Sequence, residues 1–238
     1  MLHPTALDAP SAIGDSTAQQ VSAVQSVIDH VRGAIRAGRL TPGAYVRERD
    51  LGESCGVSRG AIREAIMMLV AEGTLMREHR HIARVRQFTR EEVWAHHQIR
   101  EALEGLAAGL AASAQAQTRY HPALRDIRDR LRRHAESGDC DAYLKANYDF
   151  HALVIEMSGN PFVEAHIGLT HAAQLRMQAA RFMNRDGIDV SHAEHEEIIA
   201  AILDGDGERA EAAMRAHIRG TRGILLELPD GLFRSAGA

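Results

Sequence analysis

The chain has few cysteines, few aromatic residues and no long apolar run. Its two cysteines, Cys55 and Cys140, are too few and too far apart for a disulfide framework or a cysteine metal site. Aromatic residues make up 4% of the chain and the apolar residues are mostly Ala, Leu, Ile and Met, which favours helix over sheet. No apolar run approaches the ~18 residues of a transmembrane helix, and no signal peptide is evident. We therefore expect a cytoplasmic protein with no membrane partner.

Positive charge is nearly all arginine and is unevenly distributed. Residues 21–86 contain 11 Arg and 7 Asp or Glu, a net charge of +4. The rest of the chain contains 17 basic and 25 acidic residues, a net charge of −8. This split fits a domain that binds a polyanion, joined to a separate domain for sensing or assembly.

Composition and periodicity divide the chain into five segments. The first residues are rich in Pro, Ala, Ser, Asp and Gly, whereas apolar residues recur at helical spacing from about residue 18. The predicted segments are a mobile arm (1–17), a winged helix-turn-helix domain (18–86), a linker (87–89), a helical domain (90–228) and a tail (229–238).

A short helix opening at Ser58 is the centre of the first domain. Ser58 is a good N-cap, and the apolar residues that follow form one inward stripe: Ile62, Ala65, Ile66 and Leu69. A second short helix is expected from about 47 to 54, and residues 55–57 form a tight turn between the two, which is typical of a helix-turn-helix. Arginines on the outer face suit a helix in a DNA groove, although solvated surface arginines are an equally good reading of that helix alone.

Two short strands are expected after this helix, over 74–77 and 82–86. The polar turn between them contains Glu78, His79, Arg80 and His81. A β-hairpin after a helix-turn-helix is a wing, whose tip can reach the DNA backbone or minor groove.

Five motifs together resemble the winged-helix domain of GntR-family transcription regulators. They lie at 37–43 (AGRLTPG), 47–51 (RERDL), 56–59 (GVSR), 63–66 (REAI) and 69–73 (LVAEG). The resemblance implies a set of DNA-binding residues: Arg49, Ser58, Arg59, Gly60, Arg63, His79 and Arg80. The chain departs from the family at Gly60-Ala61, where a Thr-Pro pair is usual, and in a wing tip without glycine, so no base preference is predicted.

No strand signal follows Arg86, and the second domain is predicted to be an all-α bundle of six or seven antiparallel helices. The first of these helices should follow a capping box at 89–92 and bury Val93, Ile99, Leu103, Leu106 and Leu110. Further helices are expected over about 140–157, with Asp139 as the N-cap, over about 162–185, and after 207. Another should open at a capping box that begins at Ser191.

Three of the 14 histidines have positions that could converge. Asn147 and His151 lie one turn apart on one helix face, and the turn at 204–207 makes the helices of His195 and His217 antiparallel neighbours. Three imidazoles and one oxygen ligand suit a divalent metal, with Zn²⁺ or Ni²⁺ expected. Each histidine alone is more often an ordinary hydrogen-bonded residue.

Five further motifs resemble the FCD ligand-binding domain of the FadR subfamily: 100–104 (REALE), 147–151 (NYDFH), 158–161 (SGNP), 194–198 (EHEEI) and 214–218 (MRAHI). The resemblance implies a metal site at Asn147, His151, His195 and His217, and a small carboxylate effector gripped by Arg100, with Arg176 as a weaker candidate. Arg100 is as well explained by a structural pair with Glu104.

The favoured function is a ligand-responsive transcription regulator: a homodimeric repressor that binds a palindromic operator and is released by a small organic acid at a metal centre. Two alternatives keep this architecture, with an acyl-CoA or the metal itself as the signal. A metal-dependent hydrolase is a remote alternative, because no motif supplies a general base.

Overall fold

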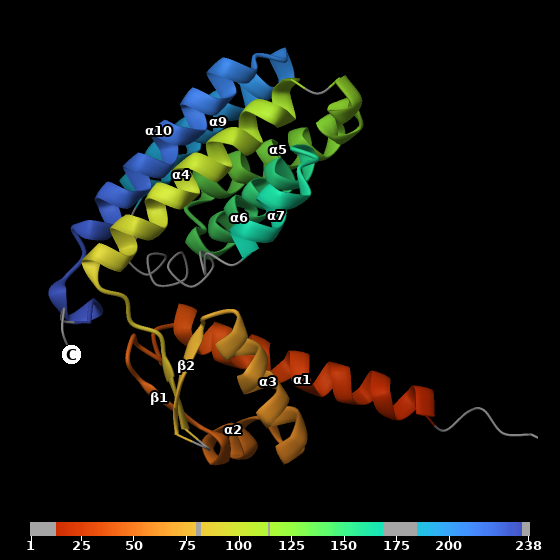
Figure 1. Ribbon diagram of the computed structural model, residues 1–238, viewed down its shortest axis with the longest axis vertical. Helices are drawn as coiled ribbons and strands as arrows, with labels where there is room; N and C mark the ends of the chain where they lie inside the picture. Colours follow the sequence, from red (N-terminus) through yellow and green to blue (C-terminus); the bar gives the residue numbers. More distant parts are fainter. Residues whose placement is uncertain (1–12, 80–81, 114, 169–184, 235–238) are drawn as a thin grey trace, which may run out of the picture. The chain divides into compact units, whose positions relative to one another are not determined.

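The computed structural model describes residues 13–79, 82–113, 115–168 and 185–234 (Figure 1). The chain folds into two compact units, Met1–Val85 and Arg86–Ala238. Within the described ranges, none of the helices has the length and apolarity needed to cross a membrane. The predicted fold class, a winged helix-turn-helix followed by a helical bundle, is confirmed.

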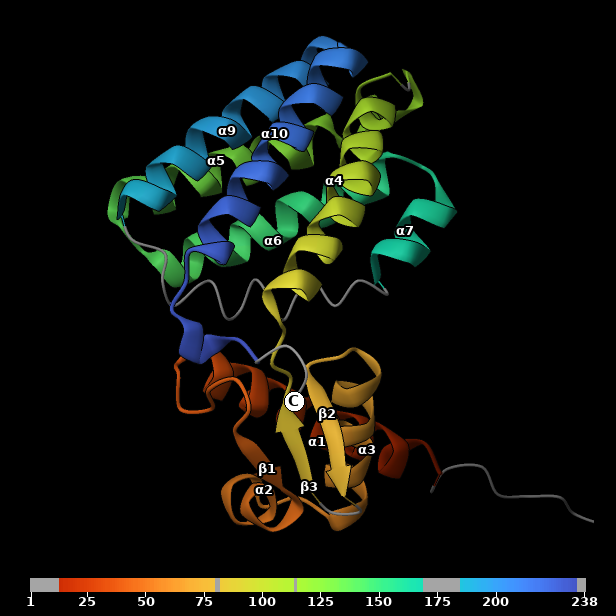
Figure 2. The same ribbon diagram turned by 60° about the vertical axis from the view of Figure 1, so that its left-hand side comes forward.

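The first unit combines three helices with a small antiparallel sheet. In chain order its elements are α1 (Ile13–Arg36), β1 (Tyr45–Arg47), α2 (Glu48–Cys55), α3 (Arg59–Ala71), β2 (Leu75–His79) and β3 (Ile82–Val85). The strands pair in the order β1-β3-β2, as Figure 2 shows, and β1 was not predicted. Helix α1 begins inside the segment assigned to the arm.

The predicted helix-turn-helix depends on two local features. Gly56, with φ of 64°, ends α2 in the left-handed conformation that glycine adopts without strain. Ser58 then caps α3 by accepting a hydrogen bond from the amide of Ala61 at 3.2 Å. All four residues of the predicted inward stripe of α3 are buried.

The second unit contains six helices within its described residues: α4 (Arg90–Ser113), α5 (His121–Ser137), α6 (Cys140–Met157), α7 (Pro161–Gly168), α9 (Arg185–Asp204) and α10 (Gly207–Leu226). Short 3₁₀ turns lie at Gln115–Tyr120 and Asp230–Leu232. Helix α10 runs along α4, and α9 packs beside α10 (Figure 1). Asp139 caps α6 as an acceptor from the amide of Ala142, so the predicted start of that helix is confirmed.

The predicted inward face of α4 is partly wrong. Ile99 and Leu106 are 52% and 39% exposed, and the face toward the bundle contains small and polar residues instead. Close packing against α10 accounts for the small residues on this face, because a Cβ added to Gly105 would lie 2.6 Å from Cγ of Arg215. Leucine side chains would hold the two helices further apart.

The predicted helix start at Ser191 is also wrong. Helix α9 already begins at Arg185, and Ser191 lies inside it, where its hydroxyl accepts a hydrogen bond from Tyr143 at 3.1 Å. Of the helix expected over 162–185, the first turns are present as α7, and residues 169–184 lie outside the described ranges.

Residues 226–233 close over the beginning of α4. The Arg90 guanidinium donates to the carbonyls of Leu226 and Leu228, pairs with Asp230 at 2.6 Å, and lies 4.1 Å from the ring centre of Phe233. Carbonyls at a helix C-terminus have no partner within the helix, so this arginine caps the end of α10.

Candidate functional site

Three histidines from three helices meet inside the bundle. His151 of α6, His195 of α9 and His217 of α10 are 2%, 0% and 4% exposed. One ring nitrogen from each lies within 4.8 Å of the other two. The sequence spacing predicted this convergence, and within the described residues this is the group of His, Cys, Asp and Glu that could hold a metal ion.

An oxygen from a neighbouring side chain contacts Nδ1 of each imidazole. His151 lies 2.6 Å from Glu104 of α4, and His217 lies 2.7 Å from Glu194 of α9. The two carboxylates accept hydrogen bonds, so they keep the proton on Nδ1 and leave the Nε2 lone pairs for a metal.

The third imidazole reaches the same tautomer through a phenol. Tyr143 donates its hydroxyl hydrogen to Ser191, and the same oxygen lies 3.2 Å from Nδ1 of His195, from which it can accept. Burial raises the pKa of Tyr143, which keeps it a neutral phenol. Burial, with the imidazoles of His217 and His151, also holds the pKa of His195 well below its ordinary value. The ring is therefore neutral at physiological pH, as a metal ligand must be.

Behind His151 lies a buried polar network on α4. Glu104 binds His151 with one carboxylate oxygen and the Arg100 guanidinium with the other, at 2.6 Å. Arg100 also lies 3.3 Å from Nε2 of His97, whose Nδ1 donates to the carbonyl of Val93 at 2.9 Å. Burial and the charge of Arg100 lower the pKa of His97 to about 4, so His97 accepts from the guanidinium as a neutral ring.

Arg100 therefore forms the pair with Glu104 that the sequence left open as the alternative to effector binding. Effector contacts by Arg100 stay a prediction. Arg176, the second effector candidate, lies outside the described residues.

Nε2 of His195 and Oδ1 of Asn147 are among the buried side-chain atoms that have no hydrogen-bond partner in the described part of the chain. Asn147 lies one turn before His151 on the same side of α6. Buried polar atoms are normally satisfied, so a site with unpartnered donor lone pairs fits a bound cation. Neutral imidazole nitrogens and an amide oxygen are suitable ligands for a divalent first-row metal. Asp149 is engaged by Arg130 at 2.5 Å instead.

The sequence reasoning missed the three side chains that orient the imidazoles: Glu104, Tyr143 and Glu194. Glu104 was considered only as a partner of Arg100. No sequence pattern pairs Glu194 with His217 across 23 positions, or Tyr143 with His195 across 52.

The predicted DNA-binding residues of α3 surround its exposed N-terminus. Arg59, Gly60 and Arg63 are exposed, and the first turn contains no acidic residue. A helix N-terminus has a partial positive charge that favours phosphate, and the arginines add to it. Arg63 also pairs with Glu48 of α2 at 3.0 Å, so this arginine has a protein partner in the absence of DNA.

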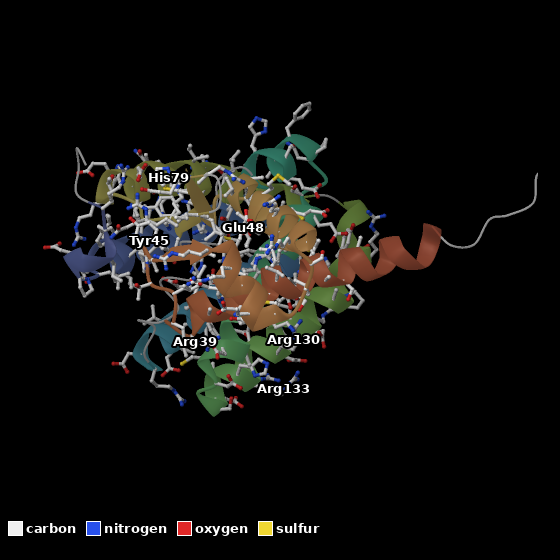
Figure 3. The ribbon with its side chains drawn as sticks, turned by 90° about the horizontal axis from the view of Figure 1, so that it is seen from below. Arg39, Tyr45, Glu48, His79, Arg130 and Arg133 are labelled. Carbon is white, nitrogen blue, oxygen red and sulfur yellow. The ribbon has the colours of Figure 1, made fainter. Side chains whose placement is uncertain are left out.

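Two further predicted residues lie on neighbouring elements of the same unit. The Arg49 side chain is 78% exposed on α2, and His79 is exposed at the end of β2, beside a bulge in the pairing with β3. Figure 3 labels His79 with Tyr45 of β1 and Glu48 of α2. Arg80, at the wing tip, lies outside the described ranges.

A winged helix joined to a helical bundle with a buried histidine cluster defines a class of protein, the transcription regulator with a separate sensory domain. Residues 23–85 match the gntR family of bacterial regulatory proteins, and residues 95–220 match the FCD domain. The chain therefore belongs to the GntR family of DNA-binding transcription regulators, and its FCD domain is consistent with the FadR subfamily. The family consists of regulators that bind DNA operators, not of enzymes.

Relatives agree with this assignment, and a solved structure shares the fold. The chain is 30% identical to the "Probable D-xylose utilization operon transcriptional repressor" of Paenarthrobacter nicotinovorans, over 86% of this chain and 90% of the relative. It is 29% identical to the HTH-type transcriptional regulator LutR of Bacillus subtilis, over 80% and 95%. The structure of McbR/YncC of Escherichia coli has the same fold, with a TM-score of 0.73 at 20% identity, over 85% of this chain and 96% of that one.

Proposed function

We propose that this regulator is a homodimeric repressor with a divalent metal centre, released from a palindromic operator when a small carboxylate binds at that centre. The observation that supports it is the convergence of His151, His195 and His217, each with an oxygen at Nδ1. These residues, with Asn147, would hold Zn²⁺ or Ni²⁺, which supplies a positive charge and a Lewis-acid contact for a carboxylate. The D-xylose relative is itself named as a repressor.

Effector binding would act on DNA binding through the helices that provide the histidines. The ligands come from α6, α9 and α10, so a group that joins the centre changes the forces on three helices at once. In a dimer, a change in this domain alters the distance between the two winged helices and their fit to the half-sites. Arg49, Ser58, Arg59, Gly60, Arg63 and the wing residues His79 and Arg80 would contact the operator.

Fluorescence anisotropy with DNA from upstream of the regulator's own gene tests this proposal. Protein stripped of metal and protein loaded with Zn²⁺ are each titrated with a panel of small organic acids. A carboxylate that weakens DNA binding only in the loaded wild type, and not in the triple variant His151→Ala/His195→Ala/His217→Ala, supports the proposal. Equal effects on stripped and loaded protein contradict it. A change caused by Zn²⁺ alone supports direct metal sensing in its place.

A further inference from the structure

The proposed donor set contains no negative charge. Three neutral imidazoles come from His151, His195 and His217, and Asn147 contributes a neutral amide oxygen at a position where an aspartate would contribute a carboxylate. A divalent ion held by these four groups alone keeps both of its positive charges.

The carboxylates nearest to the histidines do little to offset those charges. Glu104 is 2% exposed and shares its charge with the Arg100 guanidinium, so that pair is neutral as a whole. Glu194 is 35% exposed at its side chain, where water screens it. Asp149 is two residues from Asn147 but is paired with Arg130.

The surroundings of the histidines make an uncompensated charge unfavourable. The Phe150 ring lies against two of the imidazoles, with its centre 4.8 Å from that of His195 and 5.3 Å from that of His151. Tyr143 and Phe150 are fully buried. Buried charges need a partner of opposite sign because little water is present to solvate them.

We infer that Asn147 makes metal and carboxylate binding interdependent. An anionic group that joins the metal tightens its binding, and the metal tightens binding of the anion by the same factor, because coupling between two ligands is reciprocal. The inference rests on the proposed metal centre and adds the residue that sets its charge.

Calorimetric titration of Zn²⁺ into stripped, full-length, untagged protein tests the inference. Each titration is run with sodium chloride and with sodium acetate at equal ionic strength, and free Zn²⁺ is corrected for its weak acetate complex. We expect acetate to tighten Zn²⁺ binding by the wild type about tenfold, within the usual range for coupled ligands. Asn147→Asp should bind Zn²⁺ about tenfold more tightly without acetate and gain less than about twofold from it, because the new carboxylate supplies the missing charge.

Asn160→Asp is the matched control. Asn160 caps α7 through its side-chain oxygen, which accepts from the amides of Phe162 and Val163, and aspartate caps a helix equally well. This variant adds the same charge away from the histidines and should behave as the wild type. Asn147→Ala removes the amide but adds no charge, so it should bind Zn²⁺ more weakly and keep the acetate effect.

The outcomes separate the inference from the proposed function. An acetate effect that is equal in the wild type and Asn147→Asp overturns the inference and leaves the metal centre intact. Tight Zn²⁺ binding by the wild type with no acetate effect also overturns it. Absence of Zn²⁺ binding in the wild type and in Asn147→Asp overturns the metal centre, and the inference with it.

Discussion

The two units place the polar groups proposed to be functional in opposite environments. In the winged helix the side chains of Arg49 and Arg63 are 78% and 54% exposed, whereas the three histidines of the bundle are almost completely buried. An exposed arginine costs little free energy to place, so its presence alone is weak evidence of function. A buried, unpartnered imidazole nitrogen costs folding free energy, so its presence points to a ligand that repays the cost.

The units also differ in how their sites are assembled. The residues of α3 proposed to contact DNA lie within positions 58–63, and one cap at Ser58 sets the start of the helix. The histidine centre joins residues 151 to 217 through three helices. Substitutions in the winged helix should therefore act one at a time, and substitutions in the bundle should act through shared contacts.

The largest effect should come from removing a buried ligand. His195→Ala should weaken Zn²⁺ binding at least ~1,000-fold, because loss of a ligand exceeds the ~10–100-fold typical for loss of a group that orients one. The measurement is competition with a chromophoric chelator. His166→Ala, which removes an exposed histidine of α7, is the control and should bind as the wild type does. Similar Zn²⁺ affinities for the two variants would contradict the assignment of the buried His195, and not the exposed His166, as a metal ligand.

An exposed arginine should matter only when DNA is present. Arg59→Ala should weaken operator binding roughly 30-fold, as expected for loss of one arginine contact, and should leave the free energy of unfolding unchanged. The slope of log affinity against log salt should become shallower by the amount expected for the loss of about one phosphate contact. Arg125→Ala, at an exposed site on α5, is the control in the same gel-shift and urea titrations. Full operator binding by Arg59→Ala would contradict the assignment of α3 to the DNA interface.

The buried network on α4 should make the protein less stable in acid. His97 has its pKa lowered to about 4 in the folded chain, against 6.5 when unfolded, so the unfolded chain binds the extra proton first as the pH falls. The contribution of neutral His97 to the free energy of unfolding is fully present above pH ~6.5 and is lost as the pH falls toward ~4. At pH 5 the loss is about 2 kcal/mol. Between pH 7 and pH 5, the free energy of unfolding of His97→Gln should therefore fall by about 2 kcal/mol less than that of the wild type, as measured by urea titration at each pH. Identical pH dependence in wild type and variant would show that His97 is accessible to protons.

The smallest effect should come from the carboxylates that orient the imidazoles. Glu104→Gln should weaken Zn²⁺ binding about tenfold, because the amide holds His151 less well and breaks the pair with Arg100. Glu194→Gln should have a smaller effect, since Glu194 is 35% exposed at its side chain and water can replace it. The same chelator competition measures both variants. A larger effect at Glu194 would contradict the role of burial in this comparison.

The sequence predicted features that depend on local rules. The cap at Ser58, the stripe of α3 and the cap at Asp139 follow from a few adjacent residues, and the structure confirms them. The histidine cluster was also predictable, because the short turn at 204–207 sets α9 and α10 side by side and fixes the heights of His195 and His217.

The features that failed depend on contacts between distant residues. Leu106 was expected inside because leucine usually is, but Gly105 and its small neighbours Ala107 and Ala108 are the buried residues, and Leu106 lies on the exposed side of α4. Ser191 has the sequence of a cap, yet its partner is Tyr143, 48 positions away. Neither packing distance nor a partner of this kind can be read from periodicity.

The most direct test of the buried centre is the metal content of purified, untagged protein. The chain is loaded with Zn²⁺ and dialysed against metal-free buffer that contains sodium acetate, the anion expected to tighten metal binding. Its metal content is then measured by elemental analysis, with circular dichroism to confirm that each variant is folded. We expect about one ion per wild-type chain, and almost none in the folded triple variant His151→Ala/His195→Ala/His217→Ala. Equal metal content in the two proteins would contradict the assignment of these three histidines as ligands.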